Sequence, residues 1–194
     1  MPGTSHTKLL LAQSLQELMV TTPLEKISVN DIVEHAGVGR NTFYYHFEDK
    51  YDLVNWYFQT GATQFLTKRT AYGNWPAMMD GMEEYFRENK VFYTNALRYT
   101  GQNNLQEYIY EFSHDIFMQE LFLLDEFHGM TKENMDVVAS FLASAFIGML
   151  THWVERGMRV HMSDYCECLE VLFKGSAMQK MFFPNGEEAE ACGC

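Results

Sequence analysis

The sequence predicts an all-α protein in two parts, a small three-helix N-terminal domain and a larger helical C-terminal domain. Apolar residues recur three and four positions apart over most of the chain, which is the spacing of one helix face. Glycines separate these segments, and no alternating run rich in β-branched residues indicates a strand. With 194 residues, 47% of them hydrophobic and 15% aromatic, the chain is long enough to fold around a buried core.

Two amphipathic helices are expected first. Leu11, Leu15 and Leu18 form a helical stripe that ends at the breaker TTP in residues 21–23. Residues 28–36 then carry apolar side chains at i, i+3, i+4 and i+7, which is one face of a helix about two turns long.

The ends of this second helix are marked by residues suited to capping. Ser28 is a suitable N-cap, and the carboxylate of Asp31 suits the positive end of the helix dipole. Gly37 follows the last apolar residue, where a residue without Cβ takes the left-handed conformation easily. A tight turn and a third helix starting near Gly39 or Arg40 are therefore expected.

The third helix is expected to expose an unusual set of side chains. Phe43 and Phe47 lie four apart and point inward, while the other side chains point outward. The outward set has hydrogen-bond donors and flat rings but no carboxylate, and consists of Arg40, Asn41, Thr42, Tyr44, Tyr45 and His46. Two helices joined by a glycine turn, the second with polar residues at its start, form a helix-turn-helix that binds DNA.

Particular DNA contacts are predicted from this arrangement. Arg40, Asn41 and Thr42 are placed at the helix start, where side chains reach base edges, while later hydroxyls and rings reach phosphates. Lys50 follows the cap Asp49 in the first turn of the next helix, where an ammonium opposes the dipole and a phosphate would explain its presence. The predicted DNA-binding residues are Ser28, Arg40, Asn41, Thr42, Tyr44, Tyr45, His46 and Lys50.

Residues 28–53 resemble the signature of the TetR/AcrR family of bacterial transcription regulators. Residues 146–158, FIGMLTHWVERGM, resemble the dimerisation helix of one branch, the DhaS-like regulators of dihydroxyacetone kinase. One departure is Gly39, where family members often have a Ser or Thr cap, and glycine caps acceptably. The resemblance implies a cytoplasmic homodimer that binds a palindromic double-stranded DNA operator and is controlled by an effector bound to the C-terminal domain.

Two alternatives remain open beside this hypothesis. In a DhaS-like activator the C-terminal domain would dock a partner protein in place of a small molecule. In the other, the chain is an interaction module that has lost DNA binding. The net charge of −12 has the wrong sign for a partner of a polyanion, although residues 1–70 carry only −1 of it, with six Lys and Arg against seven Asp and Glu.

The chain is expected to divide into four segments. Residues 1–50 form the DNA-binding domain, 51–72 a connecting helix, 73–175 the effector-binding and dimerisation domain, and 176–194 a flexible acidic tail. Within the connector, Gly61 indicates either a close helix contact or a hinge. The C-terminal domain is expected to contain helices at about 77–89, 91–99, 103–126, 132–156 and 163–174.

The C-terminal domain is rich in aromatic residues, which have two interpretations. They line a cavity for an apolar effector, or they are simply core residues at helical spacing, which is the commoner case. No individual ligand-binding residue is assigned. The set is Tyr85, Phe86, Phe92, Tyr93, Tyr99, Tyr108, Phe112, Phe117, Phe122 and Phe127.

The helix expected at 132–156 has an apolar band too wide for one neighbour, with small residues interspersed. Small residues let a second helix approach closely, so this helix and the one at 163–174 are expected to pair with their copies in a four-helix interface. A buried core helix is the alternative. The predicted interface residues are Phe141, Ala145, Gly148, Met149, Trp153, Leu169 and Leu172.

Several classes of function are not indicated. The N-terminus lacks the pattern of a signal peptide, and no uninterrupted apolar stretch reaches the ~18 residues of a membrane span. The cysteine pairs at 166 and 168 and at 192 and 194 lack the usual zinc-site spacing. No phosphate-binding loop or nucleophile motif occurs, so no catalytic residue, metal or cofactor is predicted.

Overall fold

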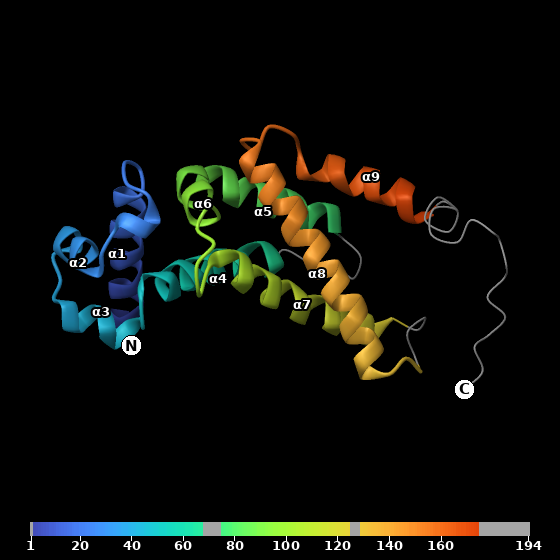
Figure 1. Cartoon of the computed structure of the whole chain (residues 1–194), viewed down its shortest axis with the longest axis horizontal. Helices are drawn as coiled ribbons and strands as arrows, with labels where there is room; N and C mark the ends of the chain where they lie inside the picture. The colour runs from blue at the N-terminus through green and yellow to red at the C-terminus, as the bar shows by residue number, and fades with distance from the viewer. Residues whose placement is uncertain (1, 68–74, 125–128, 175–194) are drawn as a thin grey trace.

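The computed structural model describes residues 2–67, 75–124 and 129–174, and these ranges contain helices and no strand (Figure 1). The all-α prediction is confirmed, whereas the acidic tail 176–194 and the end of the predicted connector lie outside the described residues. The elements are α1 Pro2–Leu18, the 3-10 turn η1 Leu24–Lys26, α2 Val29–Ala36, α3 Arg40–His46, α4 Lys50–Thr67, α5 Trp75–Glu88, α6 Lys90–Ala96, α7 Leu105–Leu123, α8 Lys132–Glu155 and α9 Met162–Lys174.

The helices form two parts joined by α4. The first three helices lie at one end of the molecule and form what we call the head, and α5 to α9 form the larger body (Figure 1). Helix α4 runs from the head into the body, where it packs against α5 and α7. The most extensive helix pair in the described part of the chain is α7 with α8.

The head has a small core in which all three helices and α4 take part. Leu11 and Leu15 of α1, Ile32 of α2, Phe43 of α3 and Leu53 of α4 are completely buried. Burial of a large apolar side chain stabilises a fold by about 1.5–3 kcal/mol, so these five side chains hold in place α2 and α3, which have only 8 and 7 residues and are too short to be stable alone.

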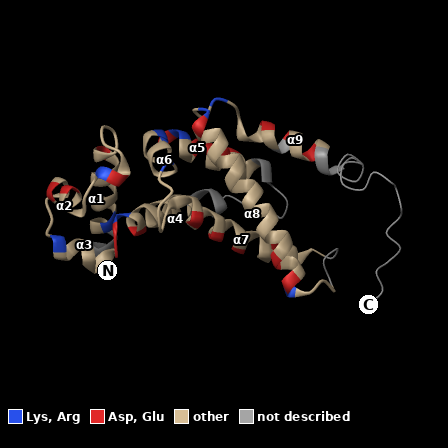
Figure 2. Ribbon diagram, in the orientation of Figure 1, with Lys and Arg blue, Asp and Glu red and all other residues tan. Residues whose placement is uncertain are grey.

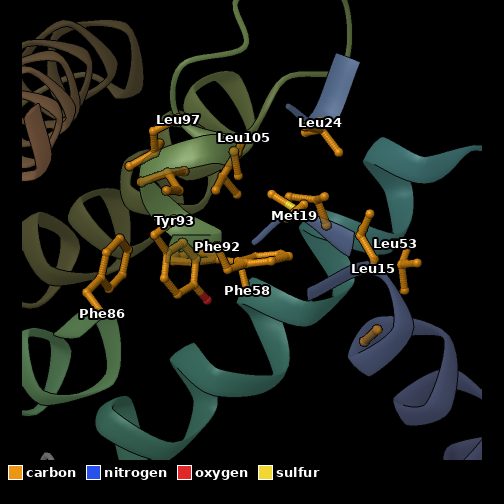
Figure 3. Packing of buried hydrophobic residues seen from close by; sticks show 14 of the residues in the cluster. Leu15, Met19, Leu24, Leu53, Phe58, Phe86, Phe92, Tyr93, Leu97 and Leu105 are labelled. Atoms are coloured by element: carbon orange, nitrogen blue, oxygen red, sulfur yellow. The ribbon is translucent and has the colours of Figure 1, made fainter. Parts of the chain in front are cut away.

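The body is packed around Phe58 of α4. Its ring makes edge-to-face contacts with Phe86 of α5, Tyr93 of α6 and Phe112 of α7, with centroids 6.3, 6.4 and 5.7 Å away. Figure 3 shows Phe58 and Phe92 between the buried residues of the body and those of the head. The two cores are therefore continuous.

Most described members of the predicted aromatic set pack in this core. Phe86, Phe92 and Tyr93 are fully or almost fully buried, and Phe86 stacks on Tyr93 at 4.1 Å. Phe122 differs, since it is 70% exposed, and Phe127 lies outside the described residues. For the buried rings, packing in the core accounts for their helical spacing without an effector.

Gly61 marks a close approach between α4 and α5. A Cβ at this position would lie 1.9 Å from Cζ of Tyr85, so the ring of Tyr85 occupies the space that a side chain would need. The Tyr85 hydroxyl donates a hydrogen bond to the carbonyl oxygen of Tyr57, one turn earlier on α4, at 3.2 Å. The sequence left a close contact or a hinge open, and the structure contains the close contact.

We predict that Gly61→Ala lowers the free energy of unfolding by about 1–3 kcal/mol, because the Tyr85 ring must move. Alanine favours a helix over glycine by about 1 kcal/mol, so a loss would identify the clash and not the backbone as its cause. Chemical denaturation measures the effect. The double variant Gly61→Ala, Tyr85→Leu is the control and should recover part of the loss, whereas equal losses in both variants would contradict this explanation.

Candidate nucleic-acid interface

The two ends of α2 carry the capping residues that the sequence indicated. The Ser28 hydroxyl accepts the backbone N–H of Asp31 at 3.2 Å, and the Asp31 carboxylate accepts the backbone N–H of Ser28 at 2.7 Å. The two hydrogen bonds with Ser28 hold the pKa of Asp31 below its usual value. At the other end of α2, Gly37 is left-handed with φ 67°. These contacts fix where α3 begins.

Helix α3 begins at Arg40 after Gly39 and buries one face only. Phe43 is completely buried, and Phe47, just after the helix, is 3% exposed. Most of the opposite side is open to solvent, with Tyr45 79% and Tyr44 47% exposed. The structure thus brings six of the predicted DNA-binding residues together on one helix, four of them exposed and two half-buried: Arg40, Asn41, Tyr44 and Tyr45, and Thr42 and His46.

Two side-chain pairs order this surface. The Arg40 guanidinium donates a hydrogen bond to the Tyr44 hydroxyl at 3.2 Å and lies 5.4 Å from the centre of the Tyr44 ring. The rings of Tyr45 and His46 meet edge to face with centroids 4.9 Å apart. A side chain that is already restricted loses less entropy when it binds, so these contacts favour recognition of a ligand by α3.

The surface of α3 has a different charge from its surroundings. Figure 2 shows a basic residue at the start of α3 and no acidic residue along it, whereas acidic residues are spread along α2 and α7. A helix that presents a guanidinium, an amide and hydroxyls without a carboxylate offers donors to a polyanion and nothing that repels it.

Lys50 contacts the head and not the exposed face of α3. Its Nζ donates to the carbonyl oxygens of Leu24 at 2.7 Å, Glu25 at 3.0 Å and Ile27 at 2.6 Å. Partial burial lowers the pKa of Lys50 from its usual value. A phosphate was the expected partner of this ammonium, and the structure supplies three carbonyl oxygens in its place. The nearby cap is as expected, since Asp49 accepts the N–H of Tyr51 at 2.7 Å.

Lys8 makes a contact that the sequence did not indicate. Its ammonium lies over the rings of Phe47 and Trp56, 5.1 and 5.4 Å from their centres, and so connects α1 to the residue after α3 and to α4. No spacing in the sequence marks this contact, because the lysine is about 40 residues or more from both rings.

The predicted dimerisation helix α8 keeps an apolar face exposed. Phe141 is 58% exposed, and Ala145 and Gly148 follow it on the same face, also exposed. By length and composition α8 is apolar enough to span a membrane, although one such helix is weak evidence for a membrane protein. Only 28% of its most apolar 18-residue stretch is buried within the chain. On α9, Leu169 is 38% exposed, whereas the side chain of Leu172 lies outside the described residues.

Trp153 has to be removed from the predicted dimer interface. It is 1% exposed, its ring lies 6.4 Å from that of Phe86, and its indole N–H donates to the carbonyl oxygen of Val160 at 2.9 Å. A side chain buried by its own chain is not available to a second copy. Helical spacing placed Trp153 in the apolar band but does not tell which side of a wide band faces the chain's own core.

Two family models match the chain. Residues 16–56 match the model described as "Bacterial regulatory proteins, tetR family", and residues 73–175 match "Transcriptional regulator C-terminal region". The first match contains α2 and α3, and the second covers the described helices of the body.

One relative and two solved structures extend this similarity. The HTH-type dhaKLM operon transcriptional activator DhaS of Lactococcus lactis is 24% identical over 177 residues, which are 91% of this chain and 84% of that protein. A solved structure of the dihydroxyacetone kinase operon activator DhaS has a TM-score of 0.60 at 20% identity, over 87% of this chain and 94% of that one. Thermus thermophilus FadR, solved with lauroyl-CoA, has a TM-score of 0.60 at 16% identity, over 96% of this chain and 100% of that one.

We predict that Lys50→Met lowers the free energy of unfolding on the order of 1–3 kcal/mol, because three carbonyl oxygens lose a charged donor while the aliphatic stem remains. Thermal unfolding followed by circular dichroism measures the effect. Lys26→Met is the control, because Lys26 lies in the segment that supplies the three carbonyl oxygens and is exposed. A melting temperature equal to that of the unchanged protein would show that the three hydrogen bonds do not stabilise the head.

Proposed function

Because this chain belongs to the tetR family of bacterial regulatory proteins, we propose that it acts as a homodimer on a palindromic operator and responds to an effector bound in its body. The family makes the chain a transcription regulator with a DNA-binding N-terminal domain. The homodimer, the particular contacts and the effector are our proposals.

The observation that supports DNA binding best is the exposed face of α3. Arg40, Asn41 and Thr42 occupy the first turn, and we assign them to base edges in the major groove. The exposed rings of Tyr44 and Tyr45, with His46, are assigned to phosphates on either side. Ser28 and Lys50 already have partners inside the head, so we assign them to its stability before any contact with DNA.

The exposed face of α8 supports the homodimer. Val137 and Phe141 are 67% and 58% exposed, and the small residues Ala145 and Gly148 continue the same face. An apolar face of this length is stable in water when a second copy covers it, and small residues allow the two backbones to approach closely. A dimer related by a two-fold axis carries two copies of α3, which matches the two half-sites of a palindrome.

Different relatives suggest different forms of control. The structure of FadR contains lauroyl-CoA, so our first candidate is control by an apolar effector of that general kind. DhaS is named as an activator, and its similarity over 91% of this chain favours, as a second candidate, activation of an operon through a partner protein. In both cases the protein would act in the cytoplasm, where its DNA is, and would not be an enzyme.

Selection of bound DNA from a random pool tests the proposed function. We predict that the purified protein enriches an inverted repeat, and that Arg40→Ala weakens binding to it by about 1–3 kcal/mol and relaxes the preference at one base position. Fluorescence anisotropy on the enriched sequence and on random DNA measures both effects. No enrichment, with and without body ligands such as acyl-CoA, would favour an interaction module that has lost DNA binding.

We predict that Ala145→Glu converts the protein from dimer to monomer, because it places a carboxylate from each copy in an apolar interface. Sedimentation equilibrium measures the mass. Val91→Glu is the matched control, since Val91 is 52% exposed on α6, away from the proposed interface. A dimer that persists in Ala145→Glu, or a monomer in the unchanged protein, would exclude this face of α8 as the interface.

A further inference from the structure

The loop between α1 and α2, residues 19–27, is held by a side chain from the body. Asn95 of α6 donates through Nδ2 to the carbonyl oxygens of Met19 at 3.2 Å and Thr22 at 3.0 Å. Its Oδ1 accepts the backbone N–H of Leu24 at 2.9 Å. Three of the four hydrogen bonds that an amide side chain can form therefore cross from the body to the head.

The backbone of Leu24 forms hydrogen bonds with side chains from two helices, α4 and α6. Its N–H donates to Asn95 of α6, and its carbonyl oxygen accepts the ammonium of Lys50 of α4. The Leu24 side chain is only 2% exposed. Removing the hydrogen-bond partner of a part-buried backbone group destabilises the fold. The side chains of Asn95 and Lys50 therefore both stabilise the loop in its present position.

The contact between the loop and α6 borders a groove on one side, although Met19 and Leu24 of the loop are buried in the same cluster as Phe92. A groove of about 670 Å³ lies between the loop and α6, and it is lined by Thr21 and Pro23 from the loop and by Val91, Thr94 and Arg98 from the body. Beside this open space, Asn95 forms three hydrogen bonds from α6 to the loop. Apolar contacts have little directional preference, so these hydrogen bonds fix the orientation of the loop against α6 more closely than the apolar packing does.

A second amide connects the other end of α6 to α1 and α4. Asn89, which directly precedes α6, accepts hydrogen bonds from Nε2 of Gln16 at 3.1 Å and from the hydroxyl of Tyr57 at 2.8 Å. Its own Nδ2 donates to the carbonyl oxygen of Tyr85 at 2.9 Å. Both ends of α6 are thus bonded to the head or its connector.

The start of α6 is also bonded to the turn between α8 and α9. Lys90 donates to the carbonyl oxygen of Gly157 at 2.8 Å, and Arg87, shortly before it, donates to that of Val160 at 3.1 Å. Helices α8 and α9 are the ones we assign to the dimer interface. Helix α6 therefore has hydrogen bonds to the head and, through Lys90, to the turn between the proposed dimerisation helices.

We propose that Asn95 is a positioning residue that fixes the separation of the two α3 helices in the dimer. It holds each head against α6, and α6 is fixed to α8 and α9, so the distance between the heads follows from the dimer interface. Without Asn95, each head would remain attached through α4 and Asn89 but would tilt more freely. This inference rests on the proposed function, since it requires a dimer that binds two half-sites.

The test compares operators in which the distance between half-sites is changed. For the unchanged protein, we expect two added base pairs to weaken binding on the order of tenfold or more, because the half-sites move along and around the duplex. For Asn95→Leu, which has a similar volume and no amide, we expect about a threefold loss or less. Fluorescence anisotropy measures, for each of the two proteins, the ratio of its affinities for the original and the lengthened operator. A merely destabilised protein would bind all operators more weakly by one factor and leave the ratio unchanged.

Two further variants make the result specific. Asn95→Asp keeps an acceptor for the N–H of Leu24 but loses the donor, and it should also reduce the dependence on spacing. Gln106→Leu removes a side-chain hydrogen bond of the same kind, to the carbonyl oxygen of Leu97 at 2.8 Å, that lies within the body, and it should keep the original ratio.

The possible failures are distinguishable. If the unchanged protein binds no inverted repeat, the proposed function fails and this inference fails with it. If the unchanged protein prefers one spacing and folded Asn95→Leu keeps the same preference, the inference about Asn95 alone is overturned. Circular dichroism identifies a variant that does not fold, and in that case Asn95→Asp decides.

Discussion

A single helix, α4, takes part in two cores at once, and the arrangement of the molecule depends on this. Leu53 and Val54 are buried where α4 leaves the head, and Phe58 and Ala62 are buried where it enters the body. Since a helix of 18 residues transmits position with little bending, the packing of Phe58 among the body's rings also determines where the head lies. Lys50, at the first residue of the same helix, then fixes the loop of the head to it.

The arrangement of the molecule also depends on the apolar surface of α8. Its 24 residues are apolar on more sides than the chain itself covers, because Ala139, Ala143 and Leu150 are buried while Val137 and Phe141 are not. The α8 sequence is thus suited to two partners, α7 within the chain and, in our proposal, a second copy. The acidic character of the body has a related effect, since it keeps most of the negative charge away from the face of α3 (Figure 2).

Local features were predictable from the sequence, and distant contacts were not. The Ser28 cap, the left-handed Gly37 and the start of α3 at Arg40 depend on neighbouring residues, so their spacing was sufficient. Trp153 was misplaced because helical spacing gives the width of an apolar band but not the side that the chain itself covers. Lys50 and Asn95 bond to backbone groups more than 20 residues away, and backbone groups leave no mark in the sequence.

The contact between Gly61 and Tyr85 has a mechanical consequence. A ring seated in the gap left by a missing side chain resists sliding of α4 along α5, because any axial shift drives the ring against the neighbouring side chains. It opposes tilting much less, since the ring can stay in place while the helices change their crossing angle. The joint between head and body is therefore a pivot and not a slide, and movements of the head should be rotations centred near the middle of α4.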